Sequence, residues 1–92
     1  MVSFEWDDTR AADNLAMHGV SFAFAMHAFK DPFAVERIDD RRDYGEERVI
    51  LIGRVLDAVL FVAYTEREER IRLISARRAT KEESADHVHQ IF

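Results

Sequence analysis

The sequence contains no cysteine, so neither a disulfide framework nor a thiolate metal site is available to it. Its first residues lack the basic and apolar stretches of a signal peptide. No apolar run approaches the roughly 20 residues that a membrane-spanning helix needs. We therefore expect a cytoplasmic protein that does not contact a membrane.

Motifs of several enzyme classes are also missing. The chain has no glycine-rich phosphate loop and no nucleophile elbow of the G-x-S-x-G type. Glu83 and His87 have the i, i+4 spacing of a two-ligand metal face, but no third ligand can be identified. We therefore expect neither a metal nor another cofactor.

The composition is that of one small domain spanning residues 1–92. The 92 residues are 48% hydrophobic and include seven phenylalanines, which is enough for one core. The net charge of −5 argues against non-specific binding to polyanions. Residues 67–81 nevertheless carry six basic and two acidic side chains, whereas residues 1–40 carry three basic and eight acidic ones. The acidic body suits a basic partner, although an ordinary solvated surface gives the same pattern.

The first third of the chain predicts a short strand and two helices. Residues 4–6 alternate as a strand, after which Asp7 or Asp8 can cap a helix that ends at His18-Gly19. Ser21 caps a second helix, which stops before Pro32 and shows the spacing of one buried face. The short connection predicts that the helices pack as a hairpin. The side chains expected to be buried are Ala11, Ala12, Leu15, Ala16, Phe22, Ala25, Met26 and Phe29.

The rest of the chain predicts an antiparallel meander of about four strands followed by a helix. The T-x-x-E spacing of Thr80 and Glu83 is a capping box that opens this last helix. Its expected inner side consists of Ala85, Val88 and Phe92. The predicted fold class is therefore α+β. The strands are expected over residues 33–38, 48–54, 59–66 and 70–77, with a charged loop over 39–47.

Clustered arginines in the last strand are the strongest chemical feature. Strand alternation places Arg70 and Arg72 on one face, together with Ile74 and Ala76. At the end of this strand follow Arg77 and Arg78. Arginine stays charged and has a fixed fork of donors, so the cluster is suited to phosphate.

The preceding strand ends in Tyr64-Thr65-Glu66, which we expect to lie close to Arg70 across the hairpin. Arginine, tyrosine and carboxylate together can cleave RNA without a metal. A base removes the 2′-OH proton, cations hold the charge on the phosphate, and an acid protonates the leaving 5′ oxygen. This hypothesis requires the guanidinium groups to converge on one phosphate. The alternative is a set of cross-strand ion pairs without function.

Two other side chains have alternative interpretations. His18 lies at a helix C-terminus, where it is either a capping cation or a catalytic group. Trp6 is either a core or interface anchor or a stacking platform for a base.

The ordered set of motifs resembles the BrnT family of toxins. The resemblance covers residues 4 to about 83, in the order and spacing of the family. IRLISARRAT at 71–80 is similar to its most characteristic stretch. The other matching segments are FEWD at 4–7, Asn14, HGVSF at 18–22, Ala25, Phe29, Asp31, EER at 46–48, IG at 52–53 and YTE at 64–66.

The resemblance implies a RelE-like fold and a ribonuclease that stops translation. It also implies an antitoxin partner that resembles BrnA, with a ribbon-helix-helix domain that binds DNA. The toxin would then approach DNA only through this antitoxin, which agrees with its net charge of −5.

Site residues follow from the resemblance one by one. Basic or acidic positions of the family pattern are occupied by Arg48, Arg72, Arg77 and Glu47, which we assign to phosphate contact and proton transfer. Further catalytic candidates are Tyr64, Glu66 and His18, and Arg70, Arg78 and Arg10 are candidates for RNA binding. The chain departs from the family pattern at Arg10, Met17, Ser84 and His87, and if the last helix contributes a catalytic group, His87 can substitute for it.

These departures motivate an alternative function. A decayed toxin would still hold its antitoxin and co-regulate a promoter without cleaving RNA. An interaction domain unrelated to toxins is the third possibility, and the ordered motif set argues against it.

Overall fold

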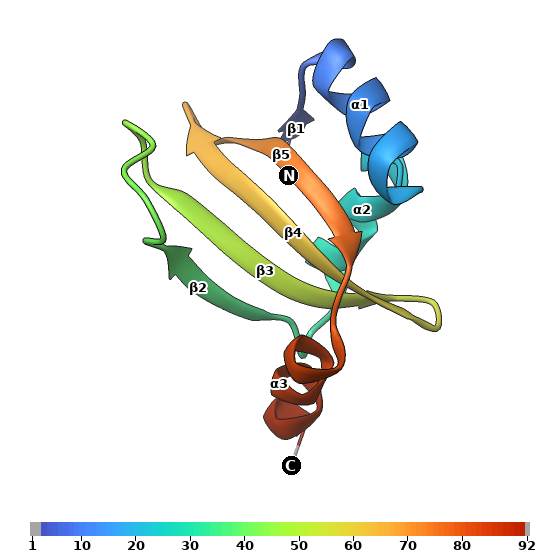
Figure 1. The fold of residues 1–92 in the computed structure, drawn as a ribbon. Helices are drawn as coiled ribbons and strands as arrows, with labels where there is room; N and C mark the ends of the chain where they lie inside the picture. The colour runs from blue at the N-terminus through green and yellow to red at the C-terminus, as the bar shows by residue number, and fades with distance from the viewer. Residues whose placement is uncertain (1–2, 92) are drawn as a thin grey trace.

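The strands form one five-stranded sheet in the order β1-β5-β4-β3-β2 (Figure 1). The computed structural model describes residues 3–91, and side chains as far as residue 88. Strands β2 to β5 form the predicted antiparallel meander. The short strand predicted at residues 4–6 is present as β1, but its parallel pairing with β5 was not predicted. The strands are β1 (Ser3–Glu5), β2 (Val35–Asp39), β3 (Arg48–Val55), β4 (Ala58–Arg67) and β5 (Arg70–Arg78).

Both predicted helix starts in the first third of the chain are confirmed. Asp7 accepts a hydrogen bond from the backbone of Arg10 and caps α1 (Asp8–His18), which ends at Gly19 in the left-handed conformation. Ser21 accepts a hydrogen bond from the backbone of Phe24 and caps α2 (Phe22–Ala25). The single second helix of the prediction is instead divided, because a 3₁₀ helix, η1 (Met26–Lys30), continues from α2.

The predicted inner face of α1 is mostly wrong, because only Ala11 of its four residues packs against the core. Ala12 and Ala16 are exposed, and Leu15 retains 50% of its accessible surface. The buried residue of this helix is Asn14. The expected helix hairpin is replaced by separate contacts with the sheet, since α1 packs on β5 and η1 packs on β3.

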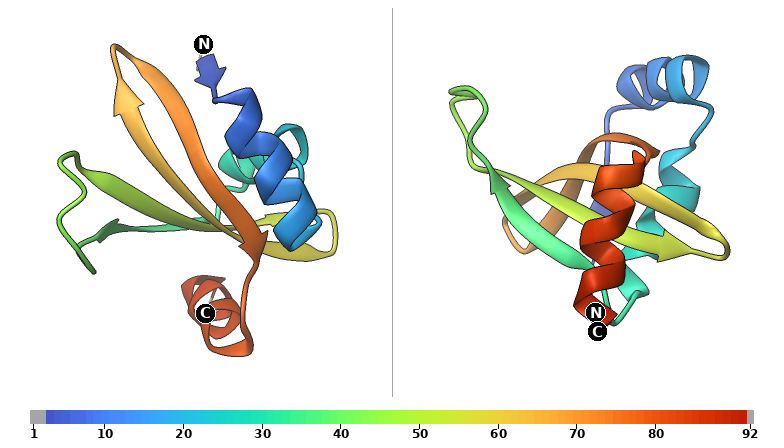
Figure 2. Two further views of the ribbon diagram at one scale, coloured as in Figure 1. Left: turned by 45° about the horizontal axis from the view of Figure 1, so that its top comes forward. Right: turned by 60° about the horizontal axis from the view of Figure 1, so that its bottom comes forward.

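Each face of the sheet has its own hydrophobic core. On one face, α1, α2 and η1 cover a large cluster that contains Phe22, Leu51 and Leu60. We call this the helical face. On the other face, a smaller cluster contains Ile50, Ile52, Phe61, Ala63 and Ile74. Figure 2 shows α3 (Lys81–Ile91) apart from α1 and α2, near the ends of β2 and β3.

A β-bulge interrupts the regular alternation of β5. Ser75 is opposite Ala63, but Leu73 is opposite Tyr64, so that Ile74 is the extra residue between them. The predicted grouping of Arg72 with Ala76 is therefore wrong, because Ala76 packs in the core of the helical face.

The capping box at the start of α3 is confirmed by both of its hydrogen bonds. Thr80 Oγ1 accepts from the backbone of Glu83, and Glu83 Oε1 accepts from the backbone of Thr80. The predicted inner side of α3 is partly wrong, because Val88 is 44% exposed and His87 is buried. Phe92 lies outside the described residues. In the part of the chain that the structure describes, no helix is long and apolar enough to cross a membrane.

Candidate active site

Seven strand arginines lie on the face of the sheet opposite the helical face. Arg72 is opposite Thr65 and Arg77 is opposite Phe61, so both point to the face of the smaller core. Without the bulge, residues 72 and 77 would point to opposite faces. We call this surface the arginine face, and its strand arginines are Arg37, Arg48, Arg54, Arg67, Arg70, Arg72 and Arg77.

A row of polar residues crosses the arginine face near the start of β3 and the end of β4. Arg72 lies between Glu5 of β1 and Thr65 of β4. On the far side of Thr65 is Arg48 of β3, because the next residue, Val49, is opposite Tyr64. Arg48 and Arg72 therefore flank Thr65 from two different strands.

Each of the three predicted catalytic arginines forms an ion pair with a different carboxylate. Arg72 Nη1 donates to Glu5 at 2.8 Å, and Arg48 Nε donates to Glu46 at 3.3 Å. The guanidinium of Arg77 holds Glu83 with two bonds of 2.8 and 2.9 Å. The ion pairs that the sequence left as an alternative are therefore present.

Arg77 differs from the other two arginines because both of its terminal nitrogens donate hydrogen bonds. Its guanidinium carbon lies 4.0 Å from the centroid of the Phe61 ring, and Nη1 also donates to the carbonyl of Arg78. The hydrogen bonds from Arg77 lower the pKa of Glu83, against a smaller opposing effect of burial. Arg77 thus connects the arginine face to α3.

The surroundings of Arg48 include a tyrosine that the sequence did not single out. The guanidinium carbon of Arg48 lies 4.0 Å from the centroid of the Tyr44 ring. The Tyr44 hydroxyl donates to the buried carboxylate of Asp39 at 3.1 Å. Two bonds from Arg41 are the main reason that the pKa of Asp39 falls to about 2.

The carboxylate of Glu46 accepts hydrogen bonds from two arginines. It accepts hydrogen bonds from Arg48 and from Arg67, both at 3.3 Å. Burial acts to raise the pKa of Glu46, but these two bonds outweigh it, and the pKa is lowered. Glu46 is therefore a carboxylate at neutral pH.

The predicted position of Tyr64 beside the arginines is wrong. Tyr64 is 3% exposed and packs in the core of the helical face, where its hydroxyl donates to Glu36 at 2.7 Å. Burial, followed by this hydrogen bond, raises its pKa. Glu66 is opposite Ile71 and therefore also on the helical-face side of β4, away from Arg70. Neighbours in the sequence of a strand point to opposite faces.

Glu47 and Glu66 line a small cavity at the ends of β3 and β4. Its volume is about 270 Å³, and Glu46, Thr65 and Arg67 are among its other lining residues. The Glu47 side chain is exposed, and its carbonyl accepts a hydrogen bond from Thr65 at 2.8 Å. The cavity thus adjoins the row that contains Thr65.

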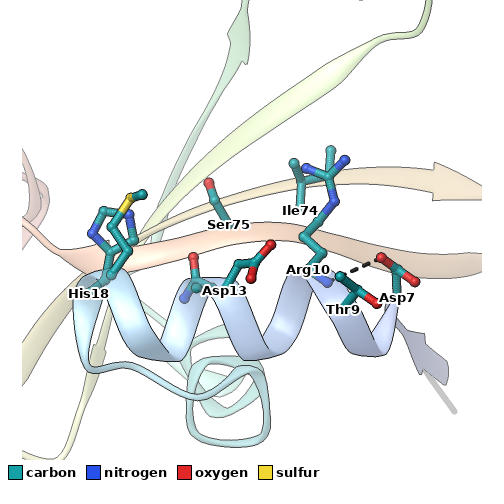
Figure 3. A pocket seen from close by; sticks show the side chains of 9 residues that line it. Asp7, Thr9, Arg10, Asp13, His18, Ile74 and Ser75 are labelled. Carbon is teal, nitrogen blue, oxygen red and sulfur yellow. Dashed lines mark hydrogen bonds between the residues drawn. The ribbon is translucent and has the colours of Figure 1, made fainter.

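A second cavity contains two other predicted residues, Arg10 and His18. It has a volume of about 380 Å³ and lies between α1 and the bulge of β5 (Figure 3).

The two remaining arginines of the prediction lie outside this cavity. Arg70 is exposed, and its guanidinium is 3.9 Å from the carboxylate of Glu5. Arg78 is opposite Leu60, so it lies on the helical-face side, away from Arg72.

The last helix contributes a buried histidine that does not face the arginine row. Nε2 of His87 lies 2.7 Å from the carboxylate of Asp31, which also accepts hydrogen bonds from the backbones of Phe33 and Arg54. Burial acts to raise the pKa of Asp31, and the hydrogen bonds, with that from Arg54 the largest, lower it overall. The two residues of the possible metal face therefore have separate partners, since Glu83 binds Arg77 and His87 binds Asp31. Among the residues described, no three His, Asp or Glu side chains gather as a metal site.

Comparison with known families shows to which family the chain belongs. The family model described as "Ribonuclease toxin, BrnT, of type II toxin-antitoxin system" matches residues 6–83. The chain belongs to the BrnT family. The resemblance seen in the sequence is therefore confirmed, and a type II toxin family implies an RNA target and an antitoxin partner. No curated protein matches this chain.

Several residues that carry the BrnT resemblance have structural roles. Asn14 binds the backbone of β5, and Asp31 joins α3 to the start of β2. A Cβ atom at Gly53 would lie 2.8 Å from the carbonyl of Ala28, so the glycine lets η1 approach β3. In this BrnT protein, Tyr44, Thr65 and Glu46 are the site residues that the sequence analysis missed. Glu46 and Thr65 carried a signal, as parts of the EER and YTE segments, and Tyr44 carried none.

Proposed function

We propose that this BrnT toxin cleaves RNA without a metal, with the scissile phosphate held between Arg48 and Arg72. The observation that carries the proposal is the row in which these two arginines flank Thr65 on one face of the sheet. Neighbouring strands are about 4.8 Å apart, so the two Cα atoms are roughly 10 Å apart across β4. Long side chains from both sides can reach one phosphate over Thr65.

The ion pairs leave donors on both arginines. Among the described residues, Arg48 uses one nitrogen in its bond to Glu46, and Arg72 uses one in its bond to Glu5. A guanidinium has five N–H donors, so each can hold a carboxylate and a phosphate oxygen together.

Glu46 is suited to the role of general base. It is ionised at neutral pH, and it lies within hydrogen-bond distance of Arg48. It would take the proton of the 2′-OH, whose oxygen then attacks the phosphorus and displaces the 5′ oxygen. The products are a 2′,3′-cyclic phosphate and a free 5′-hydroxyl. Glu47 is the second candidate for the general base, because it lines the 270 Å³ cavity at the ends of β3 and β4 together with Glu46.

Tyr44 is suited to the role of general acid in place of Tyr64. Its ring lies against Arg48, and its hydroxyl is on the arginine face, where it contacts Asp39. The phenol would give its proton to the departing 5′ oxygen, while the arginines hold the additional negative charge on the phosphate.

The experiment is cleavage of purified RNA by the purified chain in the presence of EDTA. Arg72→Ala is expected to reduce the rate about 10²–10³-fold, because it removes a charged donor from the transition state. Arg78→Ala is the matched control, since Arg78 is in the same strand on the other side of the sheet. Equal rates for Arg72→Ala and the wild type, or cleavage abolished by EDTA, would contradict the proposal. If the RNA stayed intact while the protein still bound its antitoxin, the result would instead support the alternative of a decayed toxin that no longer cleaves RNA.

For the partner, we propose an antitoxin like BrnA with a ribbon-helix-helix domain, through which alone the toxin reaches DNA. The acidic residues 1–40 suit a basic partner segment. We also propose a RelE-like arrangement of the fold and an action in the cytoplasm, where an RNA target would lie.

A further inference from the structure

The cavity between α1 and β5 adjoins the arginine face. Its β5 wall consists of the bulge residues Ile74 and Ser75, which lie between Arg72 and Arg77 in the strand. A nucleotide chain held by Arg72 would therefore pass the mouth of this cavity. With a volume of about 380 Å³, the cavity is within the range of small-ligand sites.

The α1 wall of the cavity carries side chains that are free to bind a ligand. Figure 3 shows Arg10, Asp13 and His18 extending from one side of α1 toward β5, with Asp13 between the other two. Among the residues that the structure describes, these three side chains make no hydrogen bond to the protein. The carboxylate of Asp7 is engaged in capping α1.

The charges of the cavity favour a base over a phosphate. The lining contains two carboxylates, Asp7 and Asp13, and one guanidinium, that of Arg10. An anion would be repelled there, whereas a neutral base with both donors and acceptors would be bound. Arginine pairs with the O6 and N7 acceptors of guanine, and a carboxylate requires donors, which guanine presents at N1 and N2.

We propose that this cavity binds a guanine base of the RNA, next to the nucleotide whose phosphate lies at Arg72. Asp13 accepts from guanine N1–H and N2–H, Arg10 donates to O6 and N7, and Ile74 provides an apolar wall. This inference rests on the proposed function, because it takes RNA on the arginine face as its ligand.

The test measures binding separately from cleavage. Short oligonucleotides with 2′-deoxy sugars cannot be cleaved by attack of a 2′ oxygen, and four of them would carry G, A, C or U at one position between constant flanks. Fluorescence anisotropy is expected to show at least tenfold tighter binding of the G oligonucleotide. In Asp13→Asn, this preference is expected to fall below threefold, with the affinity for the other three unchanged.

Asp8→Asn is the matched control, because it removes the same charge from the same helix but lies outside the cavity lining. It is expected to retain the guanine preference. Equal binding of all four oligonucleotides, a preference for another base, or a guanine preference unchanged in Asp13→Asn would overturn the proposal. RNA cleavage without base preference would refute this inference alone, whereas guanine-selective binding without RNA cleavage would refute only the nuclease proposal.

Discussion

The side-chain amide of Asn14 forms two hydrogen bonds with the backbone of Ala76, as a neighbouring strand would. Nδ2 donates to the Ala76 carbonyl at 2.8 Å, and Oδ1 accepts from its N–H at 3.0 Å. Nδ2 also donates to the carbonyl of Val20 at 2.9 Å. Asn14 thus fixes α1 against β5 just beyond the bulge, where β1 no longer pairs with the strand.

We predict that Asn14→Ala lowers the free energy of unfolding by about 3 kcal/mol, because buried backbone groups lose their partners. Leu15→Ala is the control in the same helix. Leu15 is 50% exposed, so its truncation is expected to cost less than about 1 kcal/mol. Urea unfolding followed by circular dichroism measures both. A larger loss for Leu15→Ala would contradict the observed orientation of α1.

We predict that the protein loses stability in acid when the carboxylate of Asp39 becomes protonated. Its pKa falls from an ordinary value of 3.8 to about 2, so the bonds of Asp39 with Arg41 and Tyr44 stabilise the fold above pH 4 and are lost as the pH falls toward 2. A depression of this size corresponds to about 2 kcal/mol at most, since Arg41 itself is largely solvated.

Unfolding free energies at pH 5.5 and pH 2.5 would test this prediction. The difference between the two pH values is expected to be smaller in Asp39→Asn than in the wild type. An identical difference in the two proteins would show that other carboxylates cause the acid sensitivity.

His87 is predicted to hold α3 against the body of the protein. His87→Ala leaves the buried Asp31 carboxylate without its 2.7 Å partner, and is expected to cost about 2–3 kcal/mol of stability. His27→Ala removes an exposed histidine and should be nearly neutral. Thermal unfolding of both variants measures the difference. If His87→Ala retained the wild-type melting temperature, the contact would be unimportant for the docking of α3.

The two tyrosines of the chain are predicted to have opposite phenotypes. Tyr44→Phe removes the proposed acid and is expected to lower kcat for RNA cleavage about 10²-fold or more, with little change in KM. Tyr64→Phe removes the bond to Glu36 and is expected to reduce stability but not kcat. Single-turnover cleavage and urea unfolding on both variants separate these effects. A loss of kcat in Tyr64→Phe alone would reverse the assignment.

The sequence by itself determined most of the elements and the places where the helices begin. The caps at Asp7, Ser21 and Thr80 were predicted correctly because each of these side chains bonds to a backbone group three residues away. The antiparallel order of β2 to β5 could also be predicted from the sequence, since short turns leave successive strands few other arrangements. The family was also evident at this level, from motifs whose order and spacing a single chain displays.

The tertiary structure alone decided which side chains meet. The bulge at Ile74 places Arg77 on the same face as Arg72, and the identity of the neighbouring tyrosine depends on how the loop before β3 folds back onto that face. Contacts such as that of Asn14 with Ala76 join residues 62 positions apart, so no local pattern reveals them. A one-residue shift in a strand reverses the face of every following side chain, and this is why the elements were predictable while the composition of the site was not.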